Sequence, residues 1–219
     1  MKDEDFTPAL GRAGPNAAYD KAIRFWTREN VWRSLFIEQI DPRPEERILD
    51  IGCGTGSLAL LLKRRAPDCE VVGIDPDPQI LEIARGKARA ASVAVDFRQG
   101  FARDALGVAG AGFDKVVSSL VFHQTPMAEK EAGLRAMAAA AKPQGELHIA
   151  DYAEQRHWLM RLLFRIVQSV DGFENTQANA DGALTRILKE MSKDVVTERV
   201  GWTPTGAISL IRARLHSGG

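Results

Sequence analysis

Three glycines at alternate positions form the most informative stretch of the sequence. Gly52, Gly54 and Gly56 follow an apolar run, residues 47–51, that is typical of a strand, and an amphipathic run comes after them. Glycine lets the backbone turn sharply and lets a ligand approach it closely. The first turn of a following helix presents unpaired N–H groups, which favour a carboxylate or a phosphate. The segment therefore predicts a ligand-binding turn from strand to helix.

Two acidic residues flank this turn. Asp50 ends the first apolar run, and Asp75 ends the second, nineteen residues after Gly56. A carboxylate at the second place can accept hydrogen bonds from both hydroxyls of a ribose. Dinucleotide folds use the spacing G-x-G-x-x-G around an anionic pyrophosphate, whereas the carboxylate of Asp50 favours a ligand that carries an ammonium group. A tight turn without a ligand is the structural alternative, but it requires fewer glycines.

His123 is the best candidate for a general base. It follows the apolar run 113–118 by a few residues, at the carboxyl edge where open α/β sheets bind ligands, and imidazole titrates in the useful range. The alternative is a hydrogen-bonded structural histidine at the start of the next helix. Asp151 and Tyr152 end a later strand at the same edge. They either contact an acceptor or serve as a helix cap and a core-edge aromatic residue.

Short apolar runs alternate with longer amphipathic ones, which predicts an α/β fold with a doubly wound sheet. The expected strands are residues 47–51, 70–74, 93–98, 113–118, 146–150, 195–200 and 207–212, and the expected helices are 16–40, 55–65, 77–89, 127–141, 156–170 and 177–193. We expect a single domain. It divides into an N-terminal helical cap (1–44), a ligand-binding core (45–152), a helical lid or substrate region (153–193) and C-terminal strands (194–219).

The composition of the chain is typical of a globular protein. Of 219 residues, 45% are hydrophobic and 26% are charged, which is ordinary for a globular chain. Lys plus Arg and Asp plus Glu both number 29, so no overall field attracts a nucleic acid or an anionic lipid surface, although a local patch can still do so. The two cysteines and the acidic start MKDEDFTPAL favour a reducing, cytoplasmic setting without a secretory signal.

The expected helix 156–170 is apolar enough that contact with a membrane has to be considered. Its stripe is expected to be a core or lid face, formed by residues 158, 159, 162, 163, 166, 167 and 170. Arg161 and Arg165 interrupt the run, which is too short and too charged to span a bilayer, so we expect no stable insertion. With Arg156 added, the segment 156–170 could still touch lipid or cover a hydrophobic substrate.

The segment Leu49–Gly56 resembles the signature of class I S-adenosylmethionine-dependent methyltransferases, especially the ubiquinone/menaquinone C-methyltransferase-like group (methyltransferase type 11). The similarity continues through the segments Val72–Asp77, Gln99–Ala102, Phe113–Ser119 and Leu134–Asp151. The resemblance implies a Rossmann-like, seven-stranded and mostly parallel sheet, S-adenosyl-L-methionine as cofactor, and S-adenosyl-L-homocysteine as product. Its implied reaction is an in-line methyl transfer to a small-molecule acceptor.

The resemblance also implies roles for individual residues. The methionine part of the cofactor would contact Asp50 and the loop Gly52, Gly54 and Gly56, and the ribose would contact Asp75. Around the nucleoside and the adenine we expect Pro76, Ile80, Gly100, Phe101 and Ala102, and beside the transferring methyl Ser118 and Ser119. Many relatives have an aspartate where Phe101 stands, so here stacking and backbone contacts would hold the adenine.

Acceptor contacts are expected from the N-terminal helical segment and from the end of the fifth strand, at Tyr19, Trp26, Arg28, Asp151 and Tyr152. No metal is expected, because the Asp-Asn pair of catechol-type methyltransferases is missing from the sequence. The tetrapeptide of amino-methylating DNA enzymes is missing as well, so we expect no nucleic-acid substrate. The alternatives are a non-catalytic cofactor-binding or regulatory module and a nicotinamide-dependent oxidoreductase.

Overall fold

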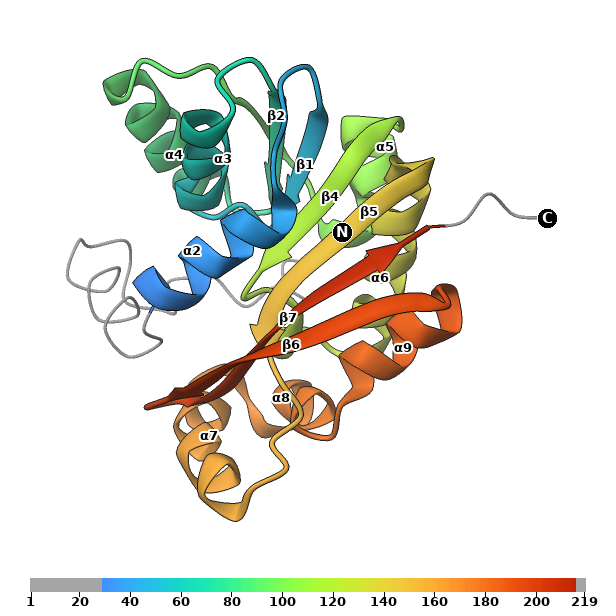
Figure 1. Ribbon diagram of the computed structural model, residues 1–219. Helices are drawn as coiled ribbons and strands as arrows, with labels where there is room; N and C mark the ends of the chain where they lie inside the picture. Colours follow the sequence, from blue (N-terminus) through green and yellow to red (C-terminus); the bar gives the residue numbers. More distant parts are fainter. Residues whose placement is uncertain (1–28, 216–219) are drawn as a thin grey trace.

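A seven-stranded sheet forms the centre of the computed structural model, which describes residues 29–215 (Figure 1). Its strands are β1 (Arg47–Ile51), β2 (Glu70–Asp75), β3 (Asp96–Gln99), β4 (Phe113–Ser119), β5 (Ala141–Tyr152), β6 (Asp194–Thr203) and β7 (Gly206–Arg214). Their spatial order is β3-β2-β1-β4-β5-β7-β6. The first five strands are parallel, whereas β7 pairs antiparallel with both β5 and β6. The predicted doubly wound, mostly parallel sheet is therefore confirmed.

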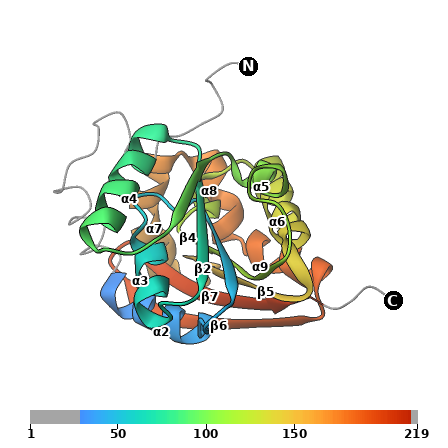
Figure 2. The ribbon, with the colours of Figure 1, turned by 90° about the horizontal axis from the view of Figure 1, so that it is seen from above.

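Helices cover both faces of this sheet (Figure 2). One layer contains α2 (Glu29–Ile40), α3 (Ser57–Arg65) and α4 (Pro78–Ala90), and the other contains α5 (Ala105–Ala109), α6 (Met127–Ala140) and α9 (Ala183–Met191). Each layer has its own apolar core. Phe36 and Leu62 pack in the first core, and Leu134 and Leu188 pack in the second. The central strands are buried on both sides, which explains why they read as continuous apolar runs instead of alternating ones.

Two further helices and two 3-10 turns lie at the end of the sheet where the parallel strands finish. They are α7 (Trp158–Asp171), α8 (Phe173–Ala180), η2 (Ala102–Asp104) and η3 (Phe122–Gln124). Helix α7 follows the carboxyl end of β5 (Figure 1), and α8 contacts both α7 and η3. Within residues 29–215, no helix combines the length and the apolar character that a membrane crossing requires.

Some element boundaries differ from the sequence-based expectation. The single helix expected over 177–193 is two helices, α8 and α9, because the backbone turns at Gly182 with φ +81°. Strand β3 begins at Asp96, three residues later than expected, and β5 begins earlier, at Ala141. The expected cap lies partly beyond the described residues, which include its helix only from Glu29 onward.

The largest correction concerns the apolar stripe of residues 156–170. Helix α7 packs against the protein through Met160, Phe164, Val167 and Gln168. Most of the residues expected to be packed, at positions 158, 162, 166 and 170, are instead exposed. The helix is apolar on two sides, so periodicity alone could not determine which side faces the core.

Candidate functional site

The glycine loop joins β1 to α3 and is attached to β2. The backbone N–H groups of Gly52 and Cys53 donate to the carbonyl of Ile74, at 2.9 and 3.0 Å. Gly52, Gly54 and Gly56 have φ values of +67°, +51° and +75°, a region that side chains other than glycine rarely adopt. The loop is thus a turn that other residues would strain.

The three glycines face different surroundings. A Cβ atom on Gly52 would collide with the side chain of Val121, and one on Gly56 would lie 2.9 Å from Cζ of Phe97. A Cβ atom on Gly54 would meet no atom within 4 Å. The first and third glycines are therefore required by packing. Gly54 faces open space, where a ligand can approach the backbone.

Asp75 lies at the end of β2 and is hydrogen-bonded to this loop. Its Oδ2 atom accepts a hydrogen bond from the N–H of Gly54 at 2.9 Å, and its Oδ1 atom accepts one from the N–H of Asp77 at 3.0 Å. Burial raises the pKa of Asp75, while these two amides oppose the rise. Because a carboxylate has about four acceptor positions, Asp75 retains capacity for the hydroxyls of a ligand.

Asp50 lies at the end of β1 and is completely buried. Neither of its carboxylate oxygens accepts a hydrogen bond within the described part of the chain. Burial raises its pKa to about 7; the guanidinium of Arg33 and, less strongly, the nearby backbone N–H of Ala59 oppose this rise, and the carboxylate of Asp75 adds to it. An unpaired buried carboxyl group is costly, so it fits a site completed by a ligand with a positive group.

The other residues expected around the cofactor occupy the same edge of the sheet. The N–H of Gly100 donates to the carbonyl of Asp75 at 3.1 Å, which places the segment Gly100, Phe101 and Ala102 next to the end of β2. Pro76 precedes α4, and the side chain of Ile80 is buried in the first turn of that helix. The ring of Phe101 is half-buried, with the Arg103 guanidinium carbon 4.4 Å from its centre.

Ser118 and Ser119 end β4 and differ in their surroundings. Ser118 is completely buried, and its hydroxyl donates to the carbonyl of Ile51 at 2.9 Å, so it links β4 to β1. Ser119 is half-buried. Leu120 follows with φ +55°, a strained conformation for a leucine. Of the two serines, Ser119 is therefore the better placed to meet a ligand.

His123 lies in η3 between two carboxylates. Its Nδ1 atom is 2.9 Å from Oδ1 of Asp151, and its Nε2 atom is 3.4 Å from Oδ2 of Asp171 at the end of α7. The other oxygen of Asp151 accepts hydrogen bonds from the N–H groups of Phe122 and His123. The ring of Tyr152 packs edge-on against the imidazole, with ring centres 4.9 Å apart.

These contacts determine the charge on the imidazole. Burial by itself would lower the pKa of His123, but Asp151 and Asp171 outweigh it and raise that pKa to about 9. The fully buried Lys130 donates to the carbonyl of Phe122, and burial lowers its pKa to about 8. At neutral pH His123 is therefore an imidazolium, which has no lone pair to accept a proton.

Two residues of this network belong to no sequence pattern that predicts their role. Asp171 ends an apolar helix, and Lys130 lies in an Ala-rich one, so neither belongs to a motif. Three expected acceptor contacts, Tyr19, Trp26 and Arg28, lie outside the described residues. The remaining two, Asp151 and Tyr152, are buried beside His123.

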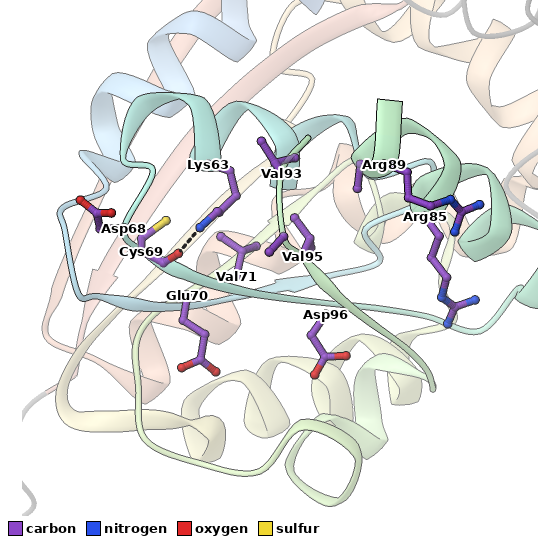
Figure 3. A pocket seen from close by; sticks show the side chains of 12 residues that line it. Lys63, Asp68, Cys69, Glu70, Val71, Arg85, Arg89, Val93, Val95 and Asp96 are labelled. Carbon is purple, nitrogen blue, oxygen red and sulfur yellow. Dashed lines mark hydrogen bonds between the residues drawn. The ribbon is translucent and has the colours of Figure 1, made fainter. Parts of the chain in front are cut away.

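A separate hollow of about 610 Å³ lies away from the glycine loop (Figure 3). Lys63 of α3, Arg85 and Arg89 of α4, and Glu70 and Asp96 at the starts of β2 and β3 line it. Glu70 and Asp96 mark the amino ends of their strands, whereas Asp50, Asp75 and the glycine loop lie at the carboxyl ends. The hollow is therefore not part of the candidate site.

Comparison with known proteins identifies the fold around this loop. Residues 48–145 match the family model described as "Methyltransferase domain". Residues 48–145 therefore form a methyltransferase domain of the class I S-adenosylmethionine-dependent type. The matched residues include Asp50, Asp75 and the glycine loop. The expected family resemblance is confirmed, and the cofactor of the family is S-adenosyl-L-methionine.

Curated relatives of this chain include a "Demethylmenaquinone methyltransferase" of Thermus thermophilus. The two are 35% identical over 135 residues, which is 62% of this chain and 60% of the relative. A "Ubiquinone biosynthesis O-methyltransferase" of Rhizobium etli is 32% identical over 152 residues, 68% of this chain and 59% of the relative. The chain thus spans about three fifths of the length of these relatives.

Solved structures share the fold. A magnesium protoporphyrin IX methyltransferase from Synechocystis, solved with bound S-adenosylhomocysteine, superimposes with a TM-score of 0.68 at 21% identity. The superposition covers 94% of this methyltransferase and 90% of the Synechocystis chain. At this identity the likeness concerns the fold alone.

Proposed function

We propose that this methyltransferase binds S-adenosyl-L-methionine at the carboxyl ends of β1 and β2 and transfers its methyl group to a small-molecule acceptor. The observation that carries the proposal is the hydrogen bond from Gly54 to Asp75, next to the open space that Gly54 faces. It brings a ribose-binding acid and a ligand-accepting loop together. The unpaired carboxyl group of Asp50 supplies an acid for the charged end of the same ligand.

The cofactor supplies a methyl group already activated by a positive sulfur, so the protein has to bind, align and exclude water. Alignment and proximity contribute roughly 7–11 kcal/mol at best. Asp75 accepts hydrogen bonds from the ribose hydroxyls, and Asp50 with the backbone of Gly52 and Gly54 holds the methionine part. Gly56 closes the turn.

The nucleoside is held by less polar residues. Pro76 and Ile80 pack against it, and Gly100, Phe101 and Ala102 border the adenine. Phe101 has no acceptor for the adenine amino group, so stacking and backbone contacts replace that hydrogen bond. Ser119, with Ser118 behind it, borders the methionine end.

Two roles are open to His123. A general base must be a neutral imidazole, and with a pKa of about 9 this form predominates only at alkaline pH. As an imidazolium, His123 instead holds the carboxylates of Asp151 and Asp171 and fixes α7 beside η3. The charge on the imidazole supports the positioning role at neutral pH, and the base role stays a prediction that a pH profile tests.

The acceptor class rests on the relatives, whose names place them in menaquinone and ubiquinone biosynthesis. A balance of 29 basic and 29 acidic residues also argues against a nucleic-acid acceptor. Tyr19, Trp26 and Arg28 are proposed to line the acceptor pocket. For Asp151 and Tyr152 the buried contacts with His123 support an indirect role in shaping that pocket.

Calorimetric titration with S-adenosylhomocysteine and, separately, with NADH tests the cofactor. We expect binding of the first and none of the second, and binding of NADH alone would overturn the proposal. Turnover is then followed as S-adenosylhomocysteine release over a panel of quinols, phenols, amines and thiols. Cofactor binding without release for any acceptor would support the non-catalytic alternative.

A further inference from the structure

Helix α7 exposes a line of large apolar side chains to solvent. The exposed fractions are 69% for Trp158, 52% for Leu162, 49% for Ile166 and 67% for Val170, and Phe173 at the start of α8 continues the line at 59%. The first four are spaced four residues apart, so they lie along one side of the helix. We call these five residues the α7 stripe.

The α7 stripe is not part of the core. The helix already packs on the protein through its other side, where Met160 and Phe164 are almost completely buried. Five of the eight exposed large hydrophobic residues of the described chain belong to the stripe. A concentration of this kind marks an interaction site more often than scattered surface residues do.

The exposed charges of α7 itself, beside the stripe, are all positive. Arg161 and Arg165 lie on the helix beside the stripe, and both are exposed. The one carboxylate of α7, Asp171, turns inward to His123. The solvent-facing side of α7 therefore carries arginines and no carboxylate.

Acidic residues do occur on the neighbouring segments. Arg161 forms an exposed ion pair of 3.1 Å with Asp181, Arg156 forms one of 2.7 Å with Glu154, and Glu174 is exposed on α8. Exposed ion pairs contribute little to stability, so the arginines can exchange these partners for phosphates. Arg165 has no ion pair among the described residues.

We propose that α7 lies flat on the surface of an anionic lipid bilayer, with the α7 stripe inserted between the headgroups. An indole, a phenyl ring and aliphatic side chains bordered by arginines are the composition of an interfacial helix. Arg161 and Arg165 then contact lipid phosphates, each strengthening binding about fivefold near the surface. The zero net charge of the chain makes this attraction local to the helix.

The shape of the patch favours lipid over a second copy of the chain. Five side chains exposed to this degree present roughly 600 Å² in one straight line, whereas a standard protein interface is a broad patch of about 20–30 residues on each side. A bilayer needs no shape complementarity, so a straight stripe on one helix is sufficient for it.

The location of α7 gives the docking a consequence for the proposed function. Asp171 connects the end of α7 to His123, at the same edge of the sheet as the glycine loop. A bilayer on the stripe would lie beside the acceptor end of the site, from which an apolar acceptor could enter. The docking itself does not depend on the proposed function.

Co-sedimentation of the full chain with vesicles tests the proposal. The vesicles contain equal parts of phosphatidylglycerol and phosphatidylcholine, and phosphatidylcholine vesicles serve as the neutral comparison. We expect stronger binding to the anionic vesicles. The double variant Ile166→Ser/Val170→Ser removes two exposed side chains from the stripe and should weaken binding more than about tenfold. Arg165→Gln should weaken binding to anionic vesicles about fivefold and leave binding to phosphatidylcholine vesicles unchanged.

Leu106→Ser is the matched control, because Leu106 is 46% exposed on α5 and lies outside the stripe. It should bind vesicles like the wild type. Wild-type protein that stays in solution at low salt would overturn the proposal, and so would a double variant that still binds. The wild type could instead form a dimer that the double variant cannot form, while vesicle binding is the same for both. A second copy would then cover the stripe, and this result would also overturn the proposal. Calorimetry with S-adenosylhomocysteine on the same variants reports on the proposed function separately.

Discussion

The Oδ2 atom of Asp75 accepts a hydrogen bond of 2.9 Å from the backbone N–H of Gly54. This bond joins the acid at the end of β2 to the loop that follows β1, two segments that lie twenty-one positions apart. The loop has an otherwise strained backbone, with positive φ at three alternate residues. Asp75 therefore both shapes the loop and presents a carboxylate beside it.

Asp75→Ala should weaken the binding of S-adenosylhomocysteine by about 10–100-fold, because hydrogen bonds to a charged group contribute about 1.5–3 kcal/mol. Asp75→Asn keeps one oxygen that can accept from the Gly54 amide, so it should lose less affinity for S-adenosylhomocysteine than Asp75→Ala. Isothermal titration calorimetry measures both variants. Equal affinity of Asp75→Ala and wild type would remove Asp75 from the cofactor site.

The glycines of the loop should respond differently to alanine. Gly52→Ala collides with Val121 and should reduce the free energy of unfolding by more than the ~1–2 kcal/mol of a strained φ alone. Gly54→Ala should reduce the free energy of unfolding only by the amount due to the strained φ. It should nevertheless impair cofactor binding, because its methyl group enters the open space. Gly107→Ala, in α5 with nothing within 4 Å and no positive φ, is the control: it should leave cofactor binding unchanged and, because it lies inside a helix, raise the free energy of unfolding by about 0.4–1 kcal/mol. Urea unfolding and calorimetry separate these effects, and unaltered cofactor affinity in Gly54→Ala would contradict the assignment.

Cofactor affinity should increase with pH as Asp50 ionises. Its pKa is about 7 in the protein alone, and a nearby ammonium group in the ligand favours the ionised form and lowers that pKa. Binding below pH 7 therefore releases a proton, so affinity rises as the pH approaches 7 and then levels off. Calorimetry in buffers of different ionisation enthalpy detects the proton. Asp50→Asn should bind more weakly and with no pH dependence in this range, and a wild-type affinity that is constant from pH 6 to 8 would argue against this role.

His123 should stabilise the fold most at low and neutral pH. Its pKa rises from 6.5 to about 9 on folding, so its contribution is complete below pH 6.5 and disappears as the pH increases through 9. His123→Gln removes the cation from two buried or half-buried carboxylates and should cost about 3–5 kcal/mol at pH 6, less at pH 10. Denaturant unfolding of both proteins at each pH gives the difference. Lys130, with a pKa of about 8, titrates over the same pH range in the wild type and in His123→Gln. Its contribution therefore cancels in the difference between their free energies of unfolding. An equal cost at both pH values would contradict the prediction.

The activity profile separates the two roles of His123. If it positions α7 as an imidazolium, turnover declines above pH 9, with little change in cofactor affinity. If it is a general base, turnover increases toward pH 9 as the neutral imidazole appears. Initial rates in wild type, compared with His123→Gln, decide between these outcomes.

The sequence alone determined the sheet, the glycine turn and the family, because these depend on local patterns. Buried parallel strands read as apolar runs, and Gly52, Gly54 and Gly56 must be glycines where φ is positive. Only the tertiary structure decided the state of His123, since Asp151 and Asp171 reach it from distant parts of the chain and set its charge. It also decided which side of α7 is buried. The helix is apolar on two sides, and only its packing on the protein selects Met160 and Phe164 and leaves Trp158 in solvent.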